Sequence, residues 1–181
     1  WSSDVCSSDL AGHEPVVYTD DFASGRDFHC RTLAAAQPGG GGLAEYLHRN
    51  RHLADVRPDL DRAPPDDAFA GFAMGSKAAM LALQADLAAV FPGALSTHVI
   101  KSPRYNDWLC EMAPAGVTKW SGATAVAARW GIAPHEICAV GDDLNDLPMI
   151  RGAGLGVAMG NAADEVREAA DVVVGTHDGT G

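Results

Sequence analysis

Short apolar runs alternate strictly with helix-like segments in the last third of the sequence. In order, these stretches are 137–140, 144–151, 154–158, 162–170 and 171–174. Apolar runs of four or five residues are typical of strands that are buried on both faces, and intervening helices connect such strands in parallel. The alternation therefore predicts an α/β unit over residues 114–181, built as a partial doubly wound sheet with helices on both faces.

Cap residues indicate where the predicted helices begin. Thr118 precedes a helical segment that runs to Trp130 and is closed by Gly131, and Asn161 stands in the same position before the segment 162–170. Side-chain oxygens of Thr and Asn accept hydrogen bonds from the free N–H groups of a first helical turn. We expect Thr118 and Asn161 to be N-caps.

The residues before this unit have a different pattern. In order, the expected elements are a strand within 14–22 that ends at the Asp20-Asp21 turn, a helix at 43–50, a polar connection at 57–67, a strand at 67–75, a helix that Ser76 caps and that runs through Val90, and two strands within 96–114 around a turn near 103–107. Strands and helices are mixed here without strict alternation. The pattern predicts a small α+β domain over residues 13–113.

Neither domain is expected to include the first twelve residues. The stretch DVCSSDL at 4–10 looks like the translation of a common sequencing adapter, and no initiator Met precedes it. A segment of this kind is not expected to be part of the native fold. The native sequence is then expected to begin near residue 11. At the other end GTHDGTG is rich in turn residues and has no closing helix, so both ends are expected to be truncated.

The charge balance limits the partners of the chain. Thirteen Lys and Arg against 24 Asp and Glu give a net charge of −11, which predicts no general attraction to nucleic acid or anionic lipid. No apolar run approaches the ~20 residues that cross a bilayer, and the four cysteines lack metal-ligand spacing. We expect a cytoplasmic protein with reduced thiols and with no nucleic-acid or membrane partner. The oligomeric state cannot be predicted.

The stretch GDDLNDLPMI at 141–150 places acidic residues directly after an apolar run. Asp142, Asp143, Asn145 and Asp146 lie close together there. Like charges at this spacing raise one another's pKa and oppose folding unless a cation or a functional geometry compensates them. Asp-rich turns are more often caps, but ligands of such sheets bind beyond the carboxyl ends of the strands. The loop is therefore expected to bind positive charge.

Four motifs, taken in order, resemble the haloacid dehalogenase-like hydrolases, specifically the Cof-like phosphatases with an α/β cap domain. They are GVTK at 116–119, GDDLNDLPMI at 141–150, GVAMGNAADEV at 156–166 and AADVVV at 169–174. The resemblance covers about residues 111–179. It implies the C-terminal half of a Rossmann-like core at 114–181, preceded by a cap domain at 13–113, which matches the family only loosely.

The resemblance also implies an activity and a set of residues. The activity is Mg²⁺-dependent hydrolysis of a small phosphorylated metabolite, such as a sugar phosphate, through an aspartyl-phosphate. Asp142 would be the metal carboxylate, with Asp143 and Asp146 as further candidate ligands, and Asp146 would orient a metal-bound water or Lys119. Lys119 would offset the negative charge at the reacting phosphate, toward which Asn145 would donate a hydrogen bond. Mg²⁺ takes few carboxylates together with water and phosphate oxygens, so a short acidic loop suffices.

The nucleophile motif of the family, Asp-x-Asp after an apolar strand, is not found in a suitable context. Asp59-Leu60-Asp61 has the spacing but lies in a polar, Pro-rich segment, and Asp20-Asp21 would point to opposite faces of a strand. Ser24-Gly25-Arg26 imitates the second family motif without a preceding buried strand. We expect the parent to be active and this polypeptide to be inactive. Without the nucleophile strand, strand 137–140 would leave an apolar edge that is prone to aggregation.

Two other classes of protein remain as alternatives. One is the phosphorylation domain of a P-type ion pump (P-type ATPase), whose acidic loop is similar but which should also show membrane spans and an Asp-Lys-Thr-Gly motif. The other is a binding or regulatory protein that kept the fold and lost catalysis. The glycines of GAGLGVAMG at 152–160 do not indicate a dinucleotide loop, because they follow a helix and lead into a strand. They are expected to serve tight turns and close packing.

Substrate contacts in the cap are the least determined feature. Arg104, Tyr105, Asn106 and Trp108 in SPRYNDW are polar and aromatic groups that could contact a leaving group. A solvated hairpin tip is the alternative that the sequence favours.

Overall fold

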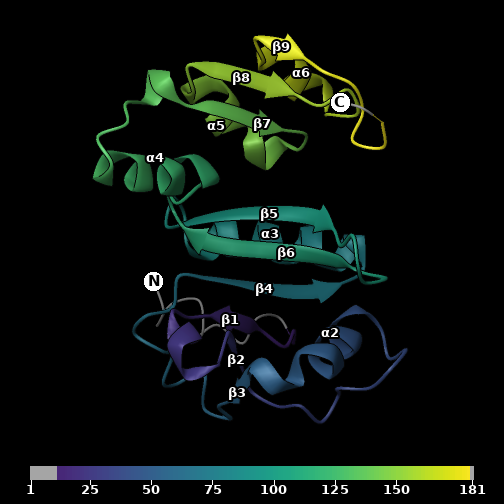
Figure 1. Cartoon of the computed structure of the whole chain (residues 1–181). Coiled ribbons are helices and arrows are strands. Elements are labelled where there is room, and N and C mark those ends of the chain that lie inside the picture. Colours follow the sequence, from purple (N-terminus) through teal and green to yellow (C-terminus); the bar gives the residue numbers. More distant parts are fainter. Residues whose placement is uncertain (1–11, 180–181) are drawn as a thin grey trace. The chain divides into compact units, whose positions relative to one another are not determined.

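The computed structural model describes residues 12–179, and the chain divides into two compact units between Ala115 and Gly116 (Figure 1). The division lies close to the domain boundary that the sequence predicts at 113/114. Each unit has its own sheet and its own apolar clusters. The assignment of the first unit as a cap domain stays a prediction.

The first unit is built on a six-stranded sheet with the strand order β3-β2-β1-β4-β6-β5. The strands are β1 (Val16–Tyr18), β2 (Phe28–Cys30), β3 (Ala54–Val56), β4 (Ala70–Gly75), β5 (Leu95–Lys101) and β6 (Trp108–Pro114). The helices are η1 (Asp21–Ser24), α2 (Gly42–Asn50), η2 (Arg51–Leu53) and α3 (Lys77–Val90). All strand pairs are antiparallel except β2 with β3. This arrangement is the α+β domain that the sequence predicts.

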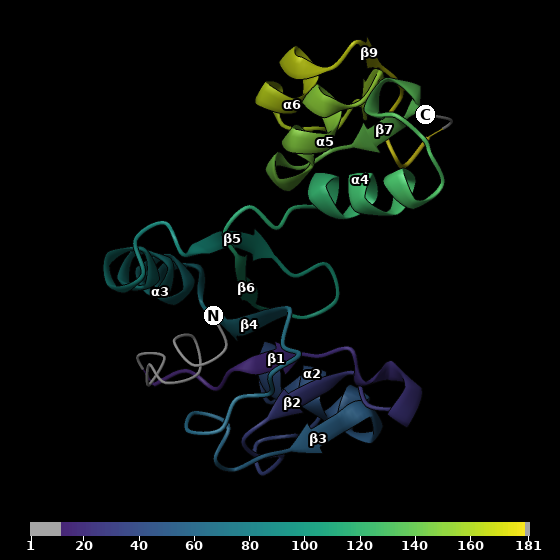
Figure 2. The same ribbon diagram turned by 90° about the vertical axis from the view of Figure 1, so that its left-hand side faces the viewer.

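Helices α2 and α3 pack against opposite faces of this sheet. Phe72 belongs to the cluster that contains Leu47 of α2, whereas its neighbour Ala73 belongs to the cluster that contains Met80 and Leu83 of α3. Successive residues of β4 point to opposite faces, so the two clusters lie on the two sides of the sheet. Helix α3 runs beside β5 and β6 (Figure 2).

The second unit contains a three-stranded parallel sheet in the order β7-β8-β9. Its strands are β7 (Cys138–Gly141), β8 (Leu155–Ala158) and β9 (Val172–Val173). Its helices are α4 (Lys119–Arg129), η3 (Pro134–Glu136), η4 (Leu144–Asp146), α5 (Leu147–Gly152) and α6 (Asp164–Ala169). The α/β class and the strict alternation are confirmed, with each element within a few residues of its predicted position.

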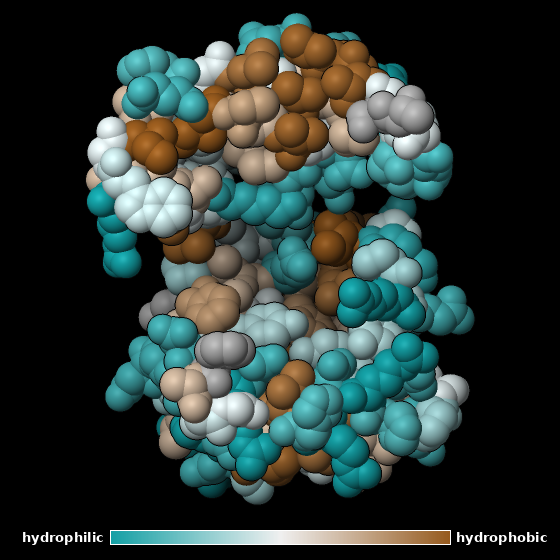
Figure 3. All heavy atoms as spheres, in the orientation of Figure 1, coloured by the Kyte–Doolittle hydropathy of each residue, from teal (hydrophilic) through white to brown (hydrophobic). Residues whose placement is uncertain are grey.

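Within residues 116–179, the sheet of the second unit has one covered face and one exposed face. Ile150 of α5 and Val166 of α6 pack with Ala158 of β8 on the covered face. On the other face Val140 is 51% exposed and Leu155 is 41% exposed. Apolar atoms gather on the surface over this sheet (Figure 3). Of the two helical layers that the sequence predicts, the described residues provide one.

Two of the three predicted caps are confirmed. The Ser76 hydroxyl accepts a hydrogen bond from the Ala79 N–H, and the Thr118 hydroxyl accepts one from the Ser121 N–H. The prediction for Asn161 is wrong, because α6 begins at Asp164 after Ala163 and the Asn161 side chain bonds elsewhere. Gly160 and Asn161 lie in a turn that returns from β8, so the helix starts later than the sequence pattern indicates.

Short strands were the least predictable elements. Strand β1 is shorter than predicted and ends at Tyr18, and the predicted turn at Asp20 and Asp21 follows it. The three-residue strands β2 and β3 were not predicted. Because each is only three residues long, neither offers a period that distinguishes a strand from a loop.

Candidate functional site

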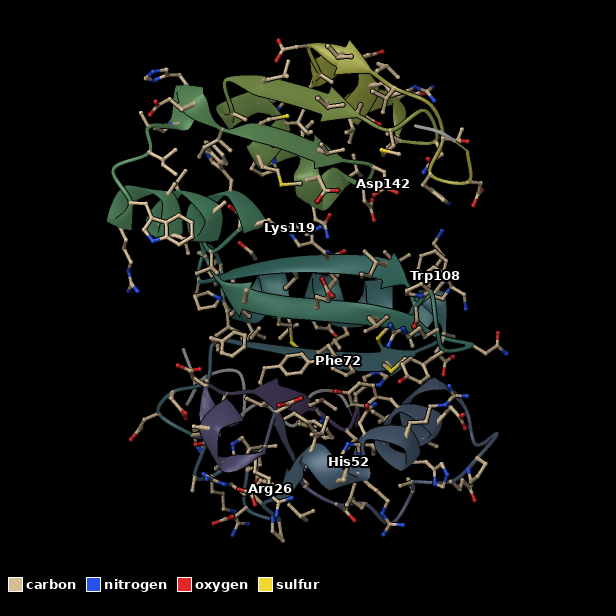
Figure 4. The ribbon with its side chains drawn as sticks, viewed as in Figure 1. Arg26, His52, Phe72, Trp108, Lys119 and Asp142 are labelled. Carbon is tan, nitrogen blue, oxygen red and sulfur yellow. The ribbon has the colours of Figure 1, made fainter. Side chains whose placement is uncertain are left out.

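The carboxyl ends of the three parallel strands carry the polar loops of the second unit. Strand β7 is followed by Asp142 and the acidic loop, β8 by the loop 159–163, and β9 by the segment 174–179, which ends in a turn at 177–179. Backbone hydrogen bonds join these segments, from the Met159 N–H to the Gly141 carbonyl and from the Gly160 N–H to the Gly175 carbonyl. Lys119, at the start of α4, and Asp142 are labelled in Figure 4.

Asp146 is the buried acid of this site. The residue is 3% exposed, and both carboxylate oxygens accept hydrogen bonds. Oδ1 lies 2.5 Å from Nζ of Lys119, and Oδ2 accepts the backbone N–H groups of Asp142 at 3.0 Å and Asp143 at 3.2 Å. Asp146 thereby ties the acidic loop to α4.

The charge state of Asp146 follows from these contacts. Burial alone raises the pKa of its carboxyl group, but the Lys119 hydrogen bond, the two backbone N–H groups and the ammonium charge together hold the pKa below its ordinary value. Asp146 is therefore ionised at neutral pH, and its charge is compensated by protein groups.

Lys119 contacts two residues of the acidic stretch. Its Nζ atom also donates to Oδ1 of Asn145 at 3.2 Å, and its side chain remains 53% exposed. The Thr118 cap and its reciprocal partner Ser121 fix the first turn of α4, from which Lys119 projects. The ammonium is thus held over the loop and remains open to an anion.

Asp142 and Asp143 differ in their surroundings. The Asp142 side chain is 47% exposed, and its Oδ2 accepts a hydrogen bond from Nδ2 of Asn161 at 3.2 Å. Asp143 is exposed, and its Oδ1 accepts the Leu144 N–H at the start of η4. Asp142 therefore presents an accessible carboxylate, whereas Asp143 is engaged as a helix cap.

The acidic side chains do not form a multi-carboxylate metal cage. Within residues 12–179, no group of three or more His, Cys, Asp or Glu side chains is arranged to hold a metal ion. The donor set nevertheless fits Mg²⁺, a hard ion that takes one or two carboxylates and completes its shell with water and phosphate oxygens. Asp142 is the residue that could hold it, because both oxygens of Asp146 accept hydrogen bonds from the protein.

Sequence reasoning missed two residues beside Asp142. Asn161 donates to its carboxylate, and Nδ1 of His177 lies 4.0 Å from its Oδ2. A signal for them was present in the sequence. Asn161 follows strand 154–158 and His177 follows strand 171–174, just as Asp142 follows strand 137–140, and the carboxyl ends of parallel strands meet at one edge.

The aromatic residues near the β5–β6 turn pack against other side chains, whereas the sequence favours a solvated hairpin tip at this position. The Tyr105 ring packs edge-on against Tyr46, and its hydroxyl accepts a hydrogen bond from Asn50. The Lys77 ammonium lies 4.5 Å from the centroid of the Trp108 ring. Arg104 and Asn106 are exposed. Tyr105 and Trp108 thus have structural contacts of their own, and a role in substrate binding stays a prediction.

Two sequences that imitate family motifs have structural roles. The Arg26 guanidinium donates to the carbonyl oxygens of His52 and Ala54 (Figure 4), and so it connects the η1–β2 segment to β3. Residues 59–61 lie in consecutive turns. The predicted polar loop is confirmed at this position.

The fold and the site define a haloacid dehalogenase-like hydrolase. Residues 57–181 match the model of the haloacid dehalogenase-like hydrolase family, and the chain belongs to this family. The match covers the second half of the first unit and the whole second unit.

Curated relatives align with parts of the chain. The stress response protein YhaX of Bacillus subtilis is 44% identical over 78 residues, which are 43% of this chain and 27% of that protein. The 5-amino-6-(5-phospho-D-ribitylamino)uracil phosphatase YcsE of Bacillus subtilis is 43% identical over 67 residues, which are 37% of this chain and 27% of that protein. The phosphoglycolate phosphatase of Methanopyrus kandleri is 43% identical over 65 residues, which are 36% of this chain and 28% of that protein.

Solved structures align with nearly the whole chain. A haloacid dehalogenase-like hydrolase from Bacteroides thetaiotaomicron has a TM-score of 0.67 at 23% identity, and the alignment covers 96% of this chain and 59% of that one. A sugar phosphatase of subclass IIB has a TM-score of 0.65 at 17% identity, with 98% and 61% covered. The chain therefore spans about three fifths of the length of these structures, and they show its fold.

Proposed function

We propose that the protein to which this chain belongs is a Mg²⁺-dependent phosphatase that hydrolyses a small phosphorylated metabolite through an aspartyl-phosphate. The observation that carries the proposal is the Lys119 ammonium, held by Asp146 and Asn145 beside an acidic loop at the carboxyl end of β7. The fixed Lys119 ammonium can bind an anion, and the acidic loop beside it can bind a metal cation that accompanies this anion. A phosphoryl group with Mg²⁺ fits that description.

Each residue of the site has a definite task in this proposal. Asp142 holds the metal ion, and the ion supplies charge neutralisation at the phosphate oxygens. Lys119 binds a phosphate oxygen, and Asn145 donates a hydrogen bond toward the same phosphate group. Asp146 keeps the ammonium in place and fixes the acidic loop through the backbone of Asp142 and Asp143. Metal roles for Asp143 and Asp146 stay predictions.

The substrate class rests on similarity. Relatives carry the names of phosphatases acting on phosphoglycolate and on a phosphoribitylamino-uracil, and one neighbour is called a sugar phosphatase. A phosphorylated sugar or a metabolite of similar size is therefore the proposed substrate, with the first unit as the cap and the cytoplasm as the location. In the described part of the chain, no helix is long and apolar enough to cross a membrane.

Phosphate release tests the proposal. The complete protein, with its own Asp-x-Asp segment, is expected to hydrolyse a sugar phosphate in the presence of Mg²⁺ and to stop when EDTA is added. Replacement of Lys119 by Met should lower kcat at least ~100-fold, the usual effect of losing one group that stabilises transition-state charge. The matched control is Arg129→Met, an exposed cation at the other end of α4.

Two outcomes would contradict the proposal. One is hydrolysis that continues unchanged in EDTA or in the Lys119→Met variant. The other is turnover of p-nitrophenyl phosphate by the 181-residue chain itself, which would contradict the expected inactivity of this chain and the need for an Asp-x-Asp nucleophile that is not found in it in a suitable strand context.

A further inference from the structure

The Asn161 side chain joins segments that follow all three parallel strands. Its Nδ2 donates to Oδ2 of Asp142 at 3.2 Å, and its Oδ1 accepts the backbone N–H of His177 at 3.0 Å. The loop that carries Asn161 is fixed on the Asp142 side as well, because the Ala163 N–H donates to the Asp142 carbonyl at 3.1 Å. The amide therefore spans from the turn after β9 to the carboxylate after β7.

The two ends of the amide are not interchangeable. A backbone N–H can only donate, so the atom of Asn161 that faces His177 must be the amide oxygen. An ionised carboxylate can only accept, so the atom that faces Asp142 must be the NH₂ group. Chemistry at both ends thus gives the same orientation of the amide, which removes the usual ambiguity of such groups.

We infer that Asn161 is a positioning residue that sets the side-chain orientation of Asp142. One carboxylate oxygen is held by the amide, and the rest of the half-exposed carboxylate is directed outward. Hydrogen-bond partners of metal ligands commonly fix ligand orientation and change metal affinity 10- to 100-fold when they are removed. The functional consequence rests on the proposed Mg²⁺ role of Asp142, whereas the orientation itself does not.

The experiment measures orientation and metal affinity separately on the whole 181-residue chain. Three-bond NMR couplings to Cγ of Asp142 report its χ1 rotamer without any metal. Titration with Mg²⁺ alone, followed by the amide signals of Gly141 and Asp143, reports affinity. The variants are Asn161→Ala and, as a matched control, Asn106→Ala, which removes an exposed amide of the first unit.

We expect one χ1 rotamer for Asp142 in the wild type and rotamer averaging in Asn161→Ala. The Mg²⁺ affinity of Asn161→Ala should be about 10-fold weaker than that of the wild type. Asn106→Ala should match the wild type in both the couplings and the affinity. Identical Asp142 couplings in the wild type and Asn161→Ala would overturn the inference. If the wild-type chain binds no Mg²⁺, the metal role of Asp142 is contradicted for this chain, whereas the proposed function is tested separately by phosphate release from the complete protein. The couplings still decide whether Asn161 positions Asp142.

A second variant protects the test against misfolding. Asn161→Asp keeps an acceptor for the His177 N–H, so the turn after β9 stays tied, and it replaces the donor to Asp142 by a carboxylate oxygen that repels Asp142. Asp142 couplings that still report the single wild-type rotamer in this variant would contradict the inference, and loss of that rotamer in both variants agrees with it.

Discussion

The Nζ atom of Lys119 lies 2.5 Å from Oδ1 of Asp146, across 27 residues of sequence. The pair joins the first turn of α4 to the loop after β7, and it puts a half-exposed cation on a buried anion. Neither residue alone indicates a site. Together they fix both the position of the ammonium and the ionisation of the carboxylate.

Loss of the ammonium should destabilise the second unit. In Lys119→Met the buried Asp146 carboxylate keeps its two backbone N–H donors but loses its charged partner. Hydrogen bonds to charged groups contribute about 1.5–3 kcal/mol, and half-exposure of Lys119 reduces that figure, so we expect a loss of about 1–2 kcal/mol. Urea unfolding at pH 7 measures it. Arg129→Met should stay within about 0.5 kcal/mol of the wild type, and an equal loss in both variants would contradict the assignment.

The same pair predicts how stability changes in acid. The pKa of Asp146 is lower in the folded chain than the ordinary carboxyl value of about 3.8. The stabilisation is therefore complete above the unfolded-state pKa and disappears as the pH falls through the lower folded-state pKa. The difference in unfolding free energy between the wild type and Asp146→Asn should shrink below about pH 4. A difference that stays constant from pH 6 to pH 3 would show that the charge of Asp146 does not contribute.

Replacement of glycine by alanine should change the stability of the second unit very differently at two positions. A Cβ on Gly156 would overlap the carbonyl oxygen of Ile150, whereas a Cβ on Gly122 in α4 meets nothing within 4 Å. Gly156→Ala should destabilise by at least about 1–3 kcal/mol, as overpacking does. Gly122→Ala should stabilise by about 0.5–1 kcal/mol, because Gly is a poor residue inside a helix. Thermal unfolding of both variants gives the comparison, and similar shifts for the two would refute the packing argument.

The sequence predicted the second unit better than the first for a physical reason. Strands such as 137–140 and 154–158 are continuous apolar runs between helical segments, so period and length agree. The close packing of Gly156 was also expected from GAGLGVAMG and is confirmed. Strands β2 and β3, with three residues each, give no such agreement. The partners of Asp142 were missed because Asn161 also suits a cap, and only the folded turn shows where its amide points.

Buried His29 makes the stability of the first unit depend on pH through a histidine whose pKa is lowered. The residue is fully buried. Burial and then the Arg57 charge lower its pKa, although Asp55 and Asp21 act in the other direction. Both acids are about 40% exposed, so solvent screens them and burial dominates. Nδ1 lies 3.1 Å from Oδ2 of Asp55 without forming a hydrogen bond, so this carboxylate acts on the ring through its charge alone.

A lowered histidine pKa means that the folded chain favours the neutral ring. The unfolded chain takes up the proton first, so stability falls as the pH drops below the ordinary value of about 6.5. The loss is at most about 1.4 kcal/mol per pH unit. His29→Gln should remove this part of the slope between pH 7.5 and 5, and His98→Gln, at an exposed site, should not. Equal slopes for His29→Gln and the wild type would contradict the prediction.

The exposed face of the second sheet should make the chain self-associate. Val140, Leu155 and Val172 point to one side of the sheet and are each more than 40% exposed, and within the described residues β7 is an edge strand with no partner beyond it. Apolar patches and open strand edges of this kind favour contact between chains. We expect sedimentation velocity to show concentration-dependent association of the wild type and a clear reduction in Val140→Lys. Val126→Lys on α4 replaces a valine of equal exposure outside the sheet and should have a smaller effect. A wild-type chain that remains monomeric at all concentrations would show that this face is not adhesive.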